Sequence, residues 1–337
     1  MAAGSATILG CLGPVLSADE AAFFAEAQPW GFILFARNVE NPGQLRRLTD
    51  DLRTSVGREA PVLIDQEGGR VQRMGPPNWR QWRPALDQVM AAGRDRAARS
   101  MFLRARLIAH ELHDVGIDAN CAPLADVARD STHPMLRNRL YGHDAPGVIG
   151  AARAVAEGLM AGGVLPVLKH LPGYGLGEVD SHQTLPRVAA PLKELRAVDF
   201  AAFRPLADLP MGMSAHIVYE AVEDGLPATM SPRLIDLIRQ EIGFDGLLMT
   251  DDLSMGALPG PLAERAALSR QAGCDIVLHC NGDRAEMEEV VGASGGLTGR
   301  AKSRADAALA ARRRPEPLDI DAAEADLAAL LDGQVYG

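Results

Sequence analysis

Short apolar segments alternate with longer helical patterns along this chain, and that alternation restricts its fold more than any other feature. Several of the apolar segments are almost continuously hydrophobic, as parallel strands covered on both faces usually are. Strands that alternate with helices indicate a parallel β/α sheet. Eight segments have this character: Ala6–Leu12, Gly31–Phe35, Pro61–Asp65, Ile117–Pro123, Leu165–His170, Pro210–His216, Gly246–Asp251 and Asp275–His279.

The intervening helices begin at recognisable capping residues. Ser17 and Glu20 have the spacing of a capping box and predict a helix over Ala18–Ala27. Asn41 is expected to cap the next helix, with Gln44 completing a second box. Capping signals between apolar segments support the alternation of strands and helices.

Eight β/α units in roughly 300 residues favour an α/β fold of the (β/α)₈, TIM-type barrel class. We expect a catalytic barrel over residues 1–299 and a C-terminal helical extension over residues 300–337, packed on the barrel as part of one domain. A doubly wound open sheet is the alternative, since it also places ligands at strand ends. No G-x-G-x-x-G lies between a predicted strand and a helix, so the dinucleotide-binding version of that fold lacks its fingerprint.

Charge and hydrophobicity exclude several partners. The formal net charge is −10, which provides no electrostatic footprint for nucleic acid or an anionic membrane. The first residues have no positive region and their apolar run is interrupted, so neither a signal peptide nor a membrane span is expected. The four cysteines form no C-x-x-C pair and are expected to be buried free thiols in a reducing compartment: Cys11, Cys121, Cys274 and Cys280.

Titratable residues gather where several predicted strands end. Asp65, Lys169, His170, His216 and Asp251 each close or directly follow a strand. In (β/α)₈ barrels the active site lies at the carboxyl ends of the strands. These side chains are therefore expected to lie together at one end of the barrel.

Two neighbouring carboxylates, Asp251 and Asp252, follow the seventh strand. Strand alternation aims Asp251 into the barrel mouth and leaves Asp252 to cap or brace the loop. A carboxylate at this position can act as a nucleophile, a metal ligand or a helix cap, and the spacing alone leaves all three open.

The loop after the fifth strand carries a carboxylate and an imidazole two residues apart. Asp180 can raise the pKa of His182 and orient it, as a proton shuttle near neutral pH requires. A structural hydrogen bond between the two is the alternative, and no ligand spacing supports a metal site. The glycines at 173, 175 and 177 predict a mobile lid carrying His182, with a rigid turn as the alternative.

Asp65 is followed by two glycines and by Arg70 and Arg73. A carboxylate here can accept hydrogen bonds from paired sugar hydroxyls, or it can form an ion pair in a turn. Arg139 is a further isolated candidate that its spacing does not single out.

Taken together, several segments resemble glycoside hydrolase family 3, most closely its bacterial β-N-acetylhexosaminidase branch. The resemblance spans roughly residues 30 to 280. It is carried by LIDQEGGRVQRM, KHLPGYG with DSH, MSAHIVY, ATMSPRLI and IRQEIGFDGLLMTDDLSM. Leu171 and Tyr174 depart from the branch, which usually has Phe and His at these positions. The second, sandwich domain of many family 3 β-glucosidases does not follow the barrel, which favours the single-domain branch.

The resemblance implies residue roles position by position. Asp251 corresponds to the nucleophile, His182 to the acid/base residue and Asp180 to its assistant. The branch's sugar-binding residues correspond to Asp65, Arg73, Arg139, Lys169 and His170.

The implied function is a retaining exo-β-N-acetylglucosaminidase of peptidoglycan recycling. Its expected substrates are small muropeptide-derived sugars that end in 1,6-anhydro-N-acetylmuramic acid. We expect a cytoplasmic monomer that needs no metal or other cofactor. A glycoside phosphorylase and a broad β-glucosidase of the same family are the alternative enzymes, and a sugar-binding protein without turnover is the non-enzymatic alternative.

Overall fold

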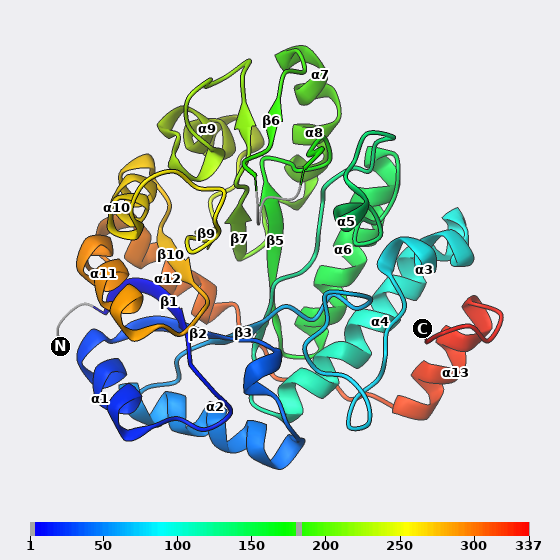
Figure 1. The fold of residues 1–337 in the computed structure, drawn as a ribbon. Helices are drawn as coiled ribbons and strands as arrows, with labels where there is room; N and C mark the ends of the chain where they lie inside the picture. Colours follow the sequence, from blue (N-terminus) through cyan, green and yellow to red (C-terminus); the bar gives the residue numbers. More distant parts are fainter. Residues whose placement is uncertain (1–3, 180–183, 337) are drawn as a thin grey trace.

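Eight parallel strands close into a barrel with helices around it (Figure 1). The computed structural model describes residues 4–179 and 184–336. In spatial order the strands are β1 (Ser5–Gly10), β10 (Ile276–His279), β9 (Leu247–Asp252), β7 (Met211–Ser214), β5 (Leu165–Leu171), β4 (Ala119–Asn120), β3 (Val62–Ile64) and β2 (Pro29–Leu34). Each overlaps one of the eight predicted segments, so the barrel is confirmed and the open sheet is excluded.

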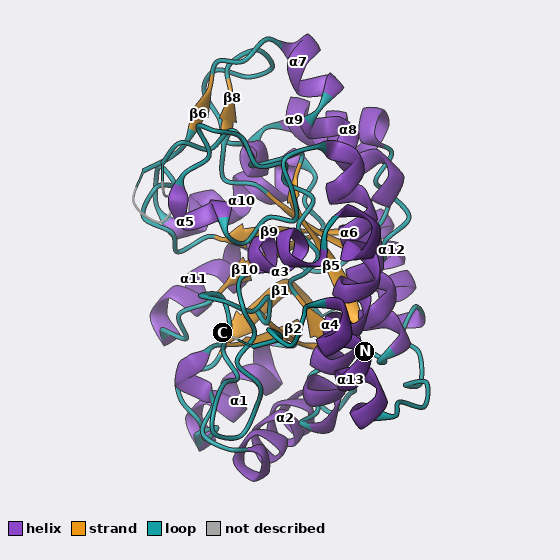
Figure 2. Ribbon diagram, turned by 90° about the vertical axis from the view of Figure 1, so that its right-hand side faces the viewer, coloured by secondary structure: helices purple, strands orange, loops and turns teal. Residues whose placement is uncertain are grey.

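The helices lie outside the strands, as Figure 2 shows from a second direction. They are α1 (Ala18–Ala27), α2 (Pro42–Val56), α3 (Ala85–Ala92), α4 (Arg94–Asp114), α5 (Pro134–Arg137), α6 (Ala145–Ala161), α7 (Leu192–Ala197), α8 (Asp199–Phe203), α9 (Pro232–Asp236), α10 (Leu262–Ala272), α11 (Arg284–Ser294), α12 (Gly299–Ala310) and α13 (Ile320–Leu330). Shorter helical turns occupy Ala36–Asn38, Arg204–Leu206, Ala228–Met230 and Leu237–Ile242. Among the described residues, no helix combines the length and the apolar character that crossing a membrane requires.

The predicted capping box at Ser17 is confirmed, because both of its hydrogen bonds are present. Asn41 also caps α2 as predicted, accepting from the backbone N–H of Gln44 at 3.0 Å. The second capping box is wrong. The side chain of Gln44 accepts instead from the N–H of Glu40 at 2.9 Å and donates to the carbonyl of Asn38 at 3.0 Å. The preceding loop thus holds this side chain away from the helix cap.

Two apolar layers stabilise the barrel. The inner layer fills the barrel with side chains such as Ile8, Leu63, Val167 and Met249. The outer layer lies between the strands and the helices and contains most of the buried hydrophobic residues. All four cysteines are buried and free, as expected.

The strand β4 is shorter than the sequence predicts, and a side chain replaces part of its pairing. The amide of Asn120 accepts from the N–H of Gln66 and donates to the carbonyl of Gln66, both at 3.0 Å. The chain after β3 is therefore tied to β4 by a side chain where backbone pairing ends.

A small two-stranded sheet beyond the barrel was not predicted. It pairs β6 (Arg187–Val188) with β8 (Val218–Tyr219) and joins the loops that follow β5 and β7. The phenol of Tyr219 donates to the carbonyl of Gly173. This sheet anchors the first part of the loop after β5.

The last helices make different contacts with the barrel. Residues of α12, including Ala305 and Ala308, pack against the inner apolar layer. The helix α13 packs along α4 at the edge of the molecule (Figure 1). The domain boundary at residue 299 stays a prediction.

The close approach of β1 to β10 generates a test of barrel packing. A Cβ added at Gly10 would lie 2.3 Å from the carbonyl oxygen of Cys280. We expect Gly10→Ala to force the two strands apart and to lower the free energy of unfolding by about 1–3 kcal/mol. Gly13→Ala is the matched control, because a Cβ there meets nothing within 4 Å. Equal urea midpoints for the two variants would contradict this account.

Candidate active site

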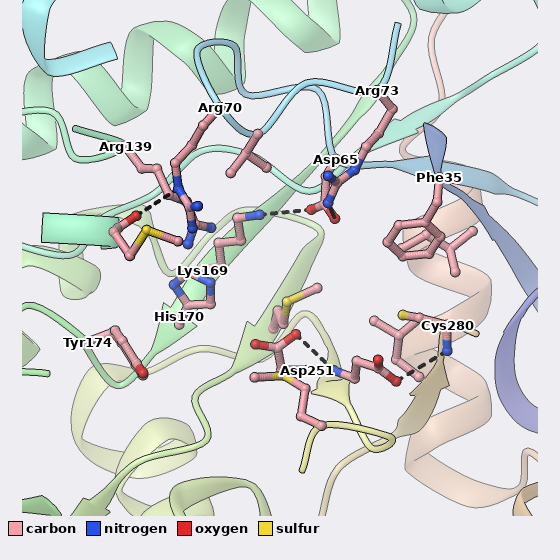
Figure 3. A pocket seen from close by; sticks show the side chains of 17 residues that line it. Phe35, Asp65, Arg70, Arg73, Arg139, Lys169, His170, Tyr174, Asp251 and Cys280 are labelled. Atoms are coloured by element: carbon pink, nitrogen blue, oxygen red, sulfur yellow. Dashed lines mark hydrogen bonds and ion pairs between the residues drawn. The ribbon is translucent and has the colours of Figure 1, made fainter. Parts of the chain in front are cut away.

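A cavity of about 400 Å³ opens at the carboxyl ends of the strands (Figure 3). Its charged lining includes six of the residues singled out in the sequence: Asp65, Arg73, Arg139, Lys169, His170 and Asp251. Lys169 and His170 lie at the end of β5 and Asp251 at the end of β9, and the other three come from the segments that follow β3 and β4. The barrel brings all of them to one end. The shared location follows directly from the parallel direction of the strands.

Buried ion pairs connect the charged residues on one wall. The ammonium of Lys169, which is only 2% exposed, lies 3.1 Å from Asp65 Oδ1 and 2.6 Å from Glu67 Oε1. Arg73 binds the other oxygen of Asp65 at 3.1 Å. Arg139 binds both oxygens of Glu67, at 2.8 and 2.9 Å. Both carboxylates are thereby held between two cations.

These contacts determine the charge states. Burial alone raises the pKa of a carboxyl group. For Asp65, the charges of Lys169 and Arg73 outweigh that effect and hold its pKa well below the usual range. For Glu67, Arg139 and Lys169 lower the pKa to about 2 despite burial. The same carboxylates raise the pKa of Lys169 although burial opposes this. All three groups are therefore charged at neutral pH.

His170 is oriented by a buried carboxylate. Its Nδ1 lies 2.8 Å from Asp126 Oδ2, so this nitrogen carries the proton. Asp126 Oδ1 also accepts from the backbone N–H of Tyr174 at 2.7 Å. Within the described part of the chain, Nε2 of His170 makes no hydrogen bond, and the ring lines the cavity.

Asp251 and Asp252 have different surroundings. Asp251 Oδ1 accepts from the N–H of Asp252 at 2.8 Å, and the rest of its carboxylate lines the cavity. Asp252 accepts from the N–H and hydroxyl of Ser254 and from the N–H of Cys280. Asp252 thus braces the loop, as the strand alternation predicts, although it also lines the cavity. Burial opposes ionisation of Asp251, but His216, His170 and this backbone N–H lower its pKa.

Asp180 and His182 lie outside the described residues, and so does the predicted movement of His182. The earlier part of their loop is held by close contacts. A Cβ on Gly175 would lie 2.0 Å from the carbonyl oxygen of Val127, and one on Gly177 would lie 2.8 Å from the ring of Tyr174. Close packing therefore explains these two glycines without a mobile lid, which favours the rigid-turn alternative for this part of the loop.

Sequence reasoning missed Glu67 and Asp126. It places His216 at a strand end but assigns it no role. Glu67 lies two residues beyond Asp65, and Asp126 lies three residues beyond a predicted strand. A systematic search for polar residues just after each strand would include both.

No metal-binding cluster is evident in residues 4–179 and 184–336. No group of three or more His, Cys, Asp or Glu side chains is arranged there to hold an ion. Of the acidic residues that line the cavity, Asp65 is paired with Lys169 and Arg73, whereas Asp251 and Asp252 accept from backbone N–H groups and Ser254.

The family model for the N-terminal domain of glycosyl hydrolase family 3 matches residues 12–308. The chain belongs to glycosyl hydrolase family 3. This confirms the resemblance that the sequence motifs indicate.

Individual relatives within glycosyl hydrolase family 3 indicate which of the family's activities this chain resembles. A β-hexosaminidase of Alkalilimnicola ehrlichii is 39% identical over 285 residues, which cover 81% of this chain and 80% of the relative. NagZ from Neisseria gonorrhoeae, solved in complex with zinc ion, has a TM-score of 0.86 at 29% identity and covers 98% of both chains. A family 3 β-N-acetylglucosaminidase from Paenibacillus is 30% identical with a TM-score of 0.77, covering 98% of this chain and 61% of that one.

These relatives identify the chain as a glycoside hydrolase of the β-hexosaminidase type. The expectation of an enzyme is confirmed, against the alternative of a sugar-binding protein without turnover. The relatives also support β-N-acetylglucosaminidase activity within family 3.

Because two buried cations bind Glu67, its replacement should affect the stability of the fold. Glu67→Gln leaves Lys169 and Arg139 with less negative charge in a buried site, and breaking such a pair typically costs about 3–5 kcal/mol. We expect the free energy of unfolding at pH 7 to fall by about that amount. Glu59→Gln is the control, because the Glu59 side chain is largely exposed beside Arg53 and should contribute little.

The pH dependence tests the cause of that loss. The folded-state pKa of Glu67 is about 2, against 4.5 for an unperturbed glutamate. Its carboxylate therefore stabilises the fold fully above pH 4.5 and loses that contribution as pH falls toward 2. In urea unfolding, the gap between wild type and Glu67→Gln should narrow across this interval. A gap that stays constant would assign the loss to packing.

Proposed function

We propose that this chain is a retaining exo-β-N-acetylglucosaminidase that removes non-reducing terminal N-acetylglucosamine from muropeptide-derived sugars. The preferred substrates end in 1,6-anhydro-N-acetylmuramic acid. Asp251 is the nucleophile, His182 is the acid/base residue and Asp180 assists it. The main support is the ionised Asp251 facing a cavity whose opposite wall carries the fixed charges of Asp65 and Lys169 (Figure 3).

The charged wall is suited to hold sugar hydroxyls. Each oxygen of Asp65 accepts one bond from a cation, which leaves lone pairs for hydroxyl donors. Nε of Arg73 is buried and has no hydrogen-bond partner among the described residues, so it can donate to a ligand. Lys169, Arg139 and His170 complete the proposed binding set. Because ion pairs hold most of these groups in place, they need little rearrangement to bind.

Hydrolysis with retention needs a nucleophile on one face of the sugar and a proton donor at the departing oxygen. Asp251 attacks the anomeric carbon and forms a glycosyl-enzyme, while His182 protonates the leaving group. His182 then takes a proton from the water that releases the sugar. The N–H of Asp252 holds one oxygen of Asp251 and leaves the other for attack. Asp180 stabilises the imidazolium form of His182.

The proposal also covers the compartment, the partners and the oligomeric state of the enzyme. Four buried, unpaired cysteines support a reducing compartment, and we place the protein in the cytoplasm. The net charge of −10 argues against nucleic acid or an anionic membrane as a partner. The proposed partner is a small carbohydrate. The enzyme acts as a monomer and uses no metal or other cofactor.

Replacement of each aspartate tests the nucleophile. Asp251→Asn keeps the shape but removes the attacking charge, so turnover of a nitrophenyl N-acetylglucosaminide should fall by several orders of magnitude. Circular dichroism should be unchanged. Asp252→Asn should lower turnover less and lower the melting temperature, since it weakens the braced loop. Near-normal activity of Asp251→Asn with an inactive Asp252→Asn would show that the wrong aspartate was chosen.

Products and substrate preference test the reaction. N-acetylglucosaminides should be cleaved far faster than glucosides, because an unfilled acetamido site loses its contacts. Proton NMR should detect the β-anomer of N-acetylglucosamine first. The product should be the same with and without added phosphate. A sugar phosphate would identify a phosphorylase, and equal rates on both substrates would identify a broad β-glucosidase.

A further inference from the structure

The residue next to the proposed nucleophile is fixed at every polar atom. The N–H of Asp252 donates to Asp251 at 2.8 Å, and its carboxylate accepts from Ser254 and Cys280. Its carbonyl oxygen lies 3.0 Å from Nε2 of His216. The backbone on both sides of Asp252 is therefore restrained. His216 is the only one of these partners that comes from the segment after β7.

His216 is buried in a chain of hydrogen bonds that leads away from the cavity. The residue is 1% exposed and is not among the described side chains that line the cavity. Its Nδ1 lies 2.9 Å from the hydroxyl of Thr229, which lies 2.8 Å from the hydroxyl of Ser214. The chain runs from β7 through the turn Ala228–Met230 to the end of β9.

The partner of Nε2 defines the position of one proton. A carbonyl oxygen can only accept, so Nε2 of His216 must donate to Asp252. Burial lowers the pKa of His216. The facing charges of Asp251 and Asp252 oppose this, whereas the nearby His170 lowers the pKa further. Nδ1 lies 2.9 Å from the hydroxyl of Thr229, whose single hydrogen also faces the carbonyl oxygen of Ala215 at 3.1 Å. The hydroxyl of Ser214, 2.8 Å away, completes the contacts of Thr229.

We propose that His216 is a positioning residue for Asp251. Through its protonated Nε2 it holds the carbonyl of Asp252 and fixes the end of β9 from which Asp251 reaches the sugar. The inference rests on the proposed role of Asp251 as nucleophile. It assigns His216 an effect on the rate of attack and not on the affinity for the sugar.

The expected size of the effect follows from the geometry of nucleophilic attack. The attacking oxygen must lie close to the anomeric carbon and in line with the departing bond. A misplacement of about 1 Å can lower the rate by about 10²-fold. Because His216 does not line the cavity, its loss should leave the groups that hold the sugar hydroxyls in place.

Two amide replacements separate positioning from space filling. The terminal nitrogen of His216→Gln can reach the place of Nε2, whereas that of His216→Asn reaches only the place of Nδ1. The probe is a 5-fluoro-N-acetylglucosaminyl fluoride, which traps the glycosyl-enzyme, and trapping is followed by intact mass. For His216→Asn we expect the trapping rate constant to fall by about 10²-fold, with little change in the inhibitor's dissociation constant. His216→Gln should recover most of the rate.

Further variants provide the controls. His110→Asn makes the same change at an exposed position of α4 and should trap at the wild-type rate. If the His216 variants do not fold, Thr229→Val and Thr229→Ser replace them. Thr229→Val removes the hydroxyl that binds Nδ1 and should slow trapping, whereas Thr229→Ser retains the hydroxyl and should slow it less.

Three results would overturn the inference. They are equal loss in folded His216→Gln and His216→Asn, a loss of affinity at an unchanged trapping rate, and no loss in any variant. The residue that carries the label tells a failure of this inference apart from a failure of the proposed function. Wild-type labelling on a residue other than Asp251 would refute the nucleophile. Labelling on Asp251 with unaffected variants would refute only the role of His216.

Discussion

The charged wall of the cavity depends on the buried ammonium of Lys169. An ion at this depth is stable only if opposite charges offset its loss of hydration. Asp65 and Glu67 provide them, and each binds one of the arginines Arg73 and Arg139 as well. Two carboxylates and three cations leave one positive charge, which the ionised Asp251 balances across the cavity. The ion pairs thereby fix both the positions and the charge states of the groups that face the sugar.

A helix outside the barrel holds this network of ion pairs in position. Arg104 on α4 is buried and donates to the carbonyl of Glu67 at 2.6 Å and to Gln88 at 2.8 Å. Its guanidinium comes so near the chain that a Cβ on Gly68 would lie 1.9 Å from it. An outer helix therefore sets the path of the loop after β3, and only glycine fits beside that contact. The packing outside the barrel therefore determines the position of Glu67, whose carboxylate binds Lys169.

The sequence predicts those parts of the protein that depend on local pattern. Apolar runs locate all eight strands, and the strand ends locate Asp65, Lys169, His170 and Asp251. Arg139 comes from an irregular segment, and only the family resemblance points to it.

Partnerships between distant segments are harder to predict. Gln44 has the spacing of a capping residue, but its side chain bonds to the loop before α2. Glu67 and Asp126 acquire their roles only when the barrel brings the segments that follow β3 and β4 to Lys169 and His170 of β5. Spacing along the chain carries no information on such contacts, because closure of the sheet creates them.

The cavity lining combines fixed charges with apolar side chains, a mixture that suits an acetamido sugar. The charged groups can bind hydroxyls. The apolar side chains include Phe35, Met213, Met255 and Leu278, and the ring of Phe35 packs against the guanidinium of Arg73. A hydroxyl placed against an apolar side chain costs free energy if it lacks a partner. An acetamido methyl needs no hydrogen bond and gains by leaving water. The apolar part of the lining therefore favours N-acetylglucosamine over glucose before any single contact to the acetamido group is assigned.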